Sequence, residues 1–185
     1  MNTMSDMREY YKFYGIYLDD WTSTFGGQTF QRHLVRDWID RAESEPSSTW
    51  VLAGRTFLFP HHIKKKYFLE GVIEGEITFG ATAKSWVSNY RVTLFKLNAD
   101  TVETDLATTG LIIPSNVTIT AGDSLSYHYW IDTFNAKEIG EYDRLGVKVE
   151  WNINSAKSGS TANIYHDYVS SEYDLWIDVP LILGD

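Results

Sequence analysis

The chain has 185 residues, with 25 acidic against 16 basic residues, no cysteine and a formal net charge of −9. The lack of cysteine excludes disulfides and thiolate metal sites. The acidic balance argues against a nucleic-acid partner, because such a protein presents a basic face, and the one lysine cluster, at 64–66, is typical of a solvated loop. No apolar run reaches the length of a membrane helix, so we expect no membrane partner either.

The first 28 residues lack the apolar core of a signal peptide, and we therefore expect synthesis in the cytoplasm. This segment is nevertheless too apolar for a free tail. We expect an arm that lies against the chain's own sandwich or against a neighbouring subunit. The aromatic side chains that would make this contact are Tyr10, Tyr11, Phe13, Tyr14, Tyr17 and Trp21.

Apolar residues four positions apart predict one short helix over 29–44. Thr29 is a candidate N-cap, and Pro46 would stop the helix because the residue before proline disfavours helical backbone angles. An extended arm ordered by its partner is the alternative. The apolar stripe consists of Phe30, Leu34, Trp38 and Ala42.

From residue 49 onward, short runs of alternating apolar residues are separated by turn-forming residues. About eight such runs occur, which is the pattern of an all-β sandwich. We predict a jelly-roll-like antiparallel β-sandwich over 49–185, preceded by an N-terminal arm over 1–48 that carries the helix. The expected strand segments are 50–59, 67–79, 85–97, 102–113, 125–131, 145–153, 162–168 and 173–183.

The clearest strand is 145–153, in which five apolar residues alternate with Gly146, Lys148, Glu150 and Asn152. Its expected partner is 125–131. In that segment Tyr129 and Ile131 would face the core, whereas Trp130 would face away.

No catalytic residue, metal site or cofactor is predicted. The five histidines lack the spacing of a local metal site, and no nucleophile or phosphate-binding motif occurs. Glu74 and Glu76 share one face of a strand. A solvated sheet face explains them better than the paired carboxylates of a glycosidase.

Exposed tryptophans offer a second interpretation, namely a carbohydrate-binding or receptor-binding sandwich. The possible sugar-stacking side chains are Trp130, Trp86 and Trp176. Single exposed aromatic residues are common on ordinary surfaces, which is the simpler explanation.

Four segments together resemble virion structural proteins of tailed bacteriophages and related viruses. The first is a strand–turn–strand run over 93–107, and the second is a Thr-Ala-Gly-Asp-Ser-Leu turn and strand at 120–125. The others are 142–149, and 162–167 followed by the closing segment 178–181. The resemblance covers roughly 50–183.

This resemblance implies a non-enzymatic jelly-roll protein: a capsid decoration, head or neck, or tail component. It implies no catalytic residues and no cofactor. The implied partners are other virion proteins, such as the major capsid, neck or tail proteins, together with further copies of the chain in a homo-oligomer. The expected location is the virion, after synthesis in the host cytoplasm.

Overall fold

The computed structural model describes residues 8–17, 23–25, 28–30, 32–35, 43–47, 53–59, 61–81, 85–110, 112, 118–119, 124–156, 162–166 and 175–184. All regular structure within these ranges is β-strand, and the strands pair antiparallel except for one parallel pair, β4 with β6. The prediction of an all-β antiparallel protein is therefore confirmed. No helix among the described residues is long and apolar enough to cross a membrane.

Fourteen strands are present in the described residues, rather than about eight. Their bounds are β1 Arg8–Tyr17, β2 Ser23–Phe25, β3 Gln28–Phe30, β4 Arg32–Val35, β5 Glu43–Ser47, β6 Ala53–Leu58, β7 Tyr67–Ala81, β8 Ser85–Leu97, β9 Glu103–Thr108, β10 Thr118–Ile119, β11 Ser124–Ile139, β12 Arg144–Ala156, β13 Ala162–His166 and β14 Trp176–Leu183.

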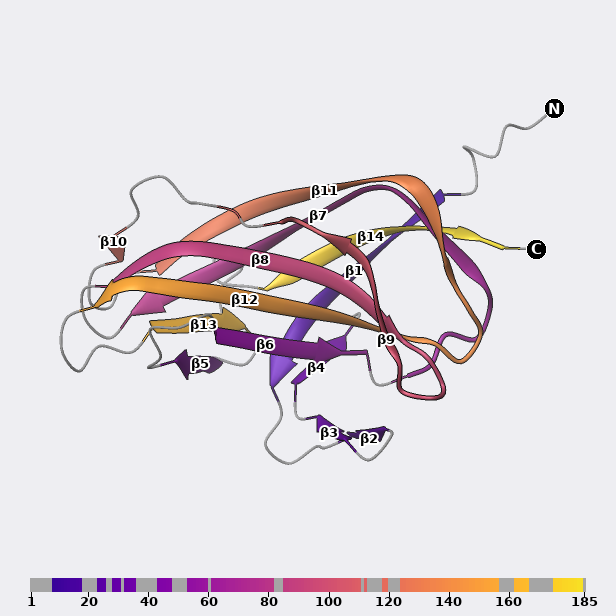
Figure 1. The fold of residues 1–185 in the computed structure, drawn as a ribbon, viewed down its shortest axis with the longest axis horizontal. Coiled ribbons are helices and arrows are strands. Elements are labelled where there is room, and N and C mark those ends of the chain that lie inside the picture. The colour runs from indigo at the N-terminus through magenta and orange to yellow at the C-terminus, as the bar shows by residue number, and fades with distance from the viewer. Residues whose placement is uncertain are drawn as a thin grey trace.

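The strands form two facing layers (Figure 1). In the first layer, β8 pairs with β12, which pairs with β6, while β9 and β10 pair with β8. In the second layer, β11 pairs with β7, β7 with β14, and β14 with β1; β13 also pairs with β7, and β5 with β13. Strand β4 pairs with both β1 and β6 and so connects the two layers. Strands β2 and β3 form a separate hairpin.

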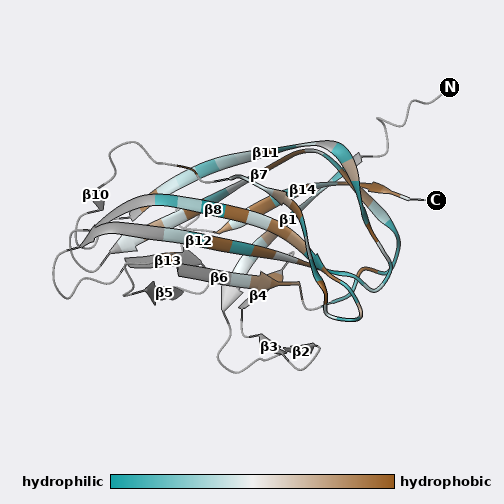
Figure 2. Cartoon of the chain, in the orientation of Figure 1, coloured by the Kyte–Doolittle hydropathy of each residue, from teal (hydrophilic) through white to brown (hydrophobic). Residues whose placement is uncertain are grey.

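Inward-facing apolar side chains from both layers form one core. Phe79 of β7 packs against Trp151 of β12 and Tyr90 of β8, with ring centroids 5.8 Å apart in both cases. Burial raises the pKa of Tyr90 and of neighbouring Tyr127 to about 12. Figure 2 shows hydrophobic positions along β8 and β14 and more hydrophilic ones along β11.

The alternation predicted for 145–153 is confirmed where side chains are described, because Leu145, Val147, Val149 and Trp151 are all buried. The predicted pairing of this strand with 125–131 is wrong. β12 pairs with β6 and β8, whereas β11 pairs with β7 in the other layer. Alternation fixes which side chains face inward, but it does not identify the partner strand.

The helix predicted over 29–44 is wrong where that range is described, because it contains β4 and parts of β3 and β5. An apolar spacing of four is also an even spacing, so it fits one face of an extended chain as well as one face of a helix. Leu34 is fully buried from β4. The division of the chain at residue 48 stays a prediction, but β1 is a full strand of the second layer.

Candidate binding face

The outer side of the second layer carries an unusual group of aromatic and acidic side chains, which we call the aromatic face. In the β-sheet register, Trp130 of β11 lies opposite Glu74 of β7, which lies opposite Asp178 of β14, which lies opposite Lys12 of β1. The adjacent row consists of His128, Glu76, Trp176 and Tyr14 in the same strand order. Eight side chains from four strands thus share one surface.

Trp130 is the most exposed large hydrophobic residue of this face, with 63% of its surface accessible. Its indole Nε1 donates a hydrogen bond to Oε2 of Glu74 over 3.3 Å. The imidazole of His128 stacks beside it, with ring centroids 6.4 Å apart and an interplanar angle of 22°. The ring of Trp176 meets the same imidazole edge-on at 6.2 Å. The three rings form one contiguous aromatic cluster.

Glu76 is the buried acid of the face. Its side chain is 11% exposed, and its Oε2 lies 2.7 Å from Nε2 of His128, whose side chain is 58% exposed. A carboxylate that orients an imidazole is an arrangement suited to accepting a proton from water or a hydroxyl group. Thr78 and Ser126 continue the same two strands, with their hydroxyl oxygens 2.7 Å apart.

Lys12 occupies the β1 side of the face. Its Nζ lies 3.9 Å from the ring centroid of Trp176 and 5.7 Å from that of Tyr14. At 3.9 Å the ammonium group is within the range of a cation–π interaction. A positive charge is therefore already held on one of the two tryptophans.

On the inner side of the same strands, Gly75 of β7 lets its neighbours pack closely. A Cβ atom on Gly75 would lie 2.4 Å from the hydroxyl oxygen of Tyr129 and 2.5 Å from the carbonyl oxygen of Trp176. Only glycine leaves room there for the Tyr129 ring, which crosses beneath β7 and donates a weak hydrogen bond to that carbonyl over 3.4 Å. Burial raises the pKa of Tyr129 far above its usual range.

The residues predicted for partner contact divide between the two sides of β1. Tyr10 is 53% exposed and Tyr14 half-buried on the outer side, whereas Phe13 is in the core and Tyr11 packs against it. Tyr11 donates to Glu9, and this hydrogen bond raises the pKa of Tyr11 most, followed by burial. Tyr17 ends β1, but its side chain and all of Trp21 lie outside the described residues.

Two of the three tryptophans predicted for sugar stacking, Trp130 and Trp176, come together on the aromatic face. The outward orientation predicted for Trp130 is confirmed. Trp86 belongs to β8 in the other layer, opposite Thr118 of β10, and its side chain lies outside the described residues. The stacking role itself stays a prediction.

Sequence reasoning missed the contribution of His128 and Lys12. Strand alternation places both side chains on the outer side. The contact of His128 with Glu76 was missed because 125–131 was predicted to pair with 145–153, whereas β11 pairs with β7. One signal was available in the sequence: Trp-Ile-Asp at 130–132 is repeated at 176–178.

A groove of about 310 Å³ opens between the edge strands β9 and β11. Its lining combines Leu106, Ala107, Thr108, Ile131, Asp132, Thr133, Asn135 and Lys137. Among the described residues, no group of three or more His, Asp or Glu side chains is arranged to hold a metal ion.

Comparison with known proteins gave matches in structure only. No family model and no curated protein sequence matches the chain. A CocE/NonD family hydrolase from Staphylococcus aureus is similar over 95% of this chain and 36% of its own, with a TM-score of 0.66 and 12% identity. An aminopeptidase from a marine sediment Thaumarchaeota archaeon matches 96% of this chain and 37% of its own, with a TM-score of 0.62 and 9% identity.

An α-amino acid ester hydrolase is also similar, over 70% of this chain and 25% of its own, with a TM-score of 0.52 and 13% identity. At such identities the likeness shows a shared fold. The chain spans about a third or less of the length of these hydrolases.

These similarities correct two predictions. The expected non-enzymatic virion structural protein is wrong, because the solved structures found to be similar to this chain are hydrolases. The expectation that the chain has no enzymatic role is wrong for the same reason. The virion signatures were strand and turn patterns, which describe a fold and do not by themselves identify a function.

Proposed function

We propose that this chain is the β-sandwich module of a hydrolytic enzyme and that its strands follow a jelly-roll-like order. One observation carries the proposal. Nearly the whole chain, 95–96% of it, aligns with 36–37% of two hydrolases. A chain that corresponds to one part of such enzymes would act beside a separate catalytic unit, as one domain does beside another.

The aromatic face supports a role close to the chemistry. The pairing of His128 with Glu76 is of the kind that takes up a proton in hydrolysis, and the imidazole is open to solvent. In a complex with a catalytic unit, this face would supply an oriented imidazole and an aromatic contact surface.

The test is a hydrolysis assay of the chain and of complexes recovered with it by cross-linking from its own cells. Substrates would be 4-nitrophenyl acetate and a set of aminoacyl 4-nitroanilides. We expect hydrolysis to follow the chain through purification as part of a complex. If neither the chain nor any recovered complex hydrolyses these esters and amides, the proposal is wrong.

A matched pair of variants tests whether the imidazole of His128 takes part in hydrolysis. His128→Ala removes the imidazole that Glu76 holds, and His62→Ala removes an exposed imidazole on the loop beside Tyr142. Loss of hydrolysis in His128→Ala alone would assign proton transfer to this pair. Equal activity in both variants would limit the module to contacts with its catalytic partner.

A further inference from the structure

The tripeptide Trp-Ile-Asp occurs three times in the chain, at 38–40, 130–132 and 176–178. The first copy lies outside the described residues, whereas the other two are in β11 and β14. In both strands the isoleucine is buried, Ile131 at 6% and Ile177 at 1% exposure. Strand alternation therefore places each tryptophan and its aspartate side by side on the aromatic face.

The copy on β14 already holds a cation. Lys12 of β1 projects over Trp176, with its Nζ 3.9 Å from the ring centroid, and in the sheet register Lys12 lies opposite Asp178. In this copy the tryptophan ring holds the ammonium group, and the aspartate two positions later lies opposite the same lysine in the sheet register.

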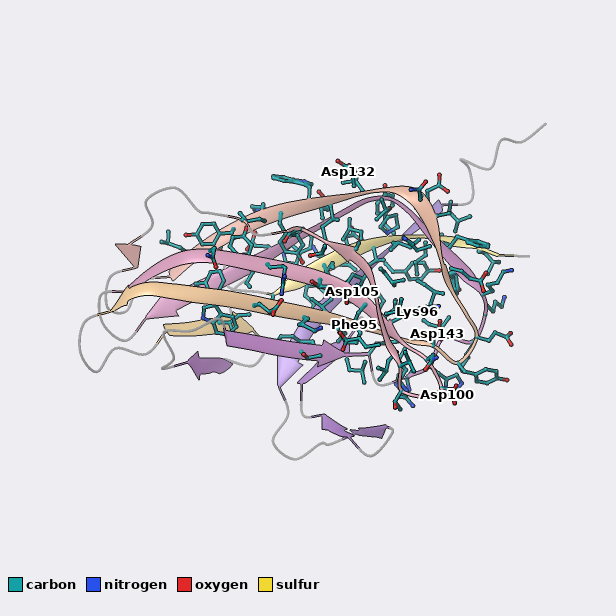
Figure 3. All side chains as sticks on the ribbon, viewed as in Figure 1. Phe95, Lys96, Asp100, Asp105, Asp132 and Asp143 are labelled. Carbon is teal, nitrogen blue, oxygen red and sulfur yellow. The ribbon has the colours of Figure 1, made fainter. Side chains whose placement is uncertain are left out.

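The copy on β11 has the same two outward-facing residue types, a tryptophan and an aspartate, and its tryptophan ring is exposed. Trp130 is 63% exposed, and Asp132 points away from the sandwich on the outer side of β11 (Figure 3). Glu74 adds a second carboxylate, held against the indole nitrogen. Among the described residues, no lysine or arginine lies over the Trp130 ring.

We propose that the open copy binds a cationic side chain, arginine or lysine, of a partner polypeptide. The indole ring attracts a cation, and arginine stacks on such rings better than lysine. Glu74 and Asp132 supply the opposite charge. Val72, which lies opposite Asp132 and is 41% exposed, offers an apolar surface for the stem of that side chain. The net charge of −9 favours approach of a basic partner. This inference does not depend on the proposed hydrolytic role.

The test follows the indole Nε1–H signals of the seven tryptophans by nuclear magnetic resonance. Trp130→Phe and Trp176→Phe variants assign the two signals of interest. The probe is the peptide acetyl-Ala-Ala-Arg-Ala-Ala-amide, and its citrulline counterpart is the neutral control. We expect a saturable shift of the Trp130 signal with the arginine peptide, no shift with the citrulline peptide, and binding about five-fold weaker in Asp132→Asn.

A gain-of-binding variant makes the comparison between the two copies decisive. In the unaltered protein the Trp176 signal should not respond, because Lys12 already covers that ring. In Lys12→Ala the β14 copy becomes open, and its Trp176 signal should then shift with the arginine peptide while Trp130 responds as before.

Three results would overturn the proposal. The first is a Trp130 signal that ignores the arginine peptide. The second is an equal response to the citrulline peptide, which would mean that charge plays no part. The third is binding of methylguanidinium as tight as that of the peptide, which would make a free organic cation, and not a polypeptide, the ligand.

Discussion

The two outer faces of the sandwich handle charge and aromatic surface in opposite ways. On the first layer, opposite charges pair: Arg91 donates to Glu150 over 2.6 Å, and Lys148 donates to Glu103. The apolar residue Phe95 on that face is only 1% exposed. On the aromatic face, Trp130 and Tyr10 are more than half exposed. A face that has buried its apolar groups serves stability, whereas a face that leaves aromatic rings exposed is suited to binding.

The largest expected difference in stability is between two variants that each remove one aromatic side chain, one from each face. Phe95→Ala should lower the free energy of unfolding by about 3–5 kcal/mol, because it removes a fully buried ring and leaves a cavity. Trp130→Ala, an exposed ring, should change it by less than about 1 kcal/mol. Urea unfolding measures both. Similar losses in the two variants would mean that Trp130 is structural and the contrast between the faces is false.

Gly146 tests how tightly the first face is packed. A Cβ atom at this position would lie 2.2 Å from Cζ of Phe95, so Gly146→Ala should cost about 1–3 kcal/mol through overpacking. The matched control is Gly140→Ala, where the nearest atom to a new Cβ is Oδ2 of Asp143 at 3.5 Å. We expect the control to unfold almost as the unaltered protein does. A neutral Gly146→Ala would show that the Phe95 ring moves freely.

The pair of Lys96 and Asp143 lies at the turn between β11 and β12, where its side chains are 23% and 8% exposed (Figure 3). Asp143 also accepts a hydrogen bond from the backbone N–H of Gly140 over 2.8 Å, which closes the turn between β11 and β12. A double-mutant cycle with Lys96→Met and Asp143→Asn should give a coupling of about 1 kcal/mol.

The control cycle uses Arg91 and Glu150, whose side chains are 38% and 17% exposed. Its coupling should be smaller, because solvent screens the more exposed pair. Equal coupling free energies in the two cycles would show that the lower solvent exposure at the turn does not strengthen the ion pair.

Alkaline unfolding probes the core that both faces share. Burial raises the pKa of Tyr90 to about 12, above the usual value of 10 for an unfolded tyrosine. The unfolded chain therefore loses this proton first, and stability is complete below pH 10 and falls as the pH rises toward 12. Tyr90→Phe should flatten this decline. An unchanged pH profile in the variant would assign the alkaline loss to other groups.

Local patterns predicted the class of the fold and the direction of most side chains, but not which strands pair. Alternation placed Val147 inward and Trp130 outward, and the structure agrees. It could not show that β11 pairs with β7 instead of β12, because register and partner depend on contacts distant in sequence. The pair of His128 and Glu76, 52 positions apart, was hidden for the same reason.

The smallest effect should come from the one enclosed pair of the aromatic face. His128→Ala leaves the buried Glu76 without the imidazole, but that imidazole is 58% exposed, so water can take its place beside the carboxylate. We expect a loss below about 1 kcal/mol, and a similar value for Glu76→Gln, by urea unfolding at pH 7. A loss of several kcal/mol in either variant would make this pair a structural element. The aromatic face would then resemble the first face, where partners exist to hold the sheet together, and the case for binding there would rest on Trp130 alone.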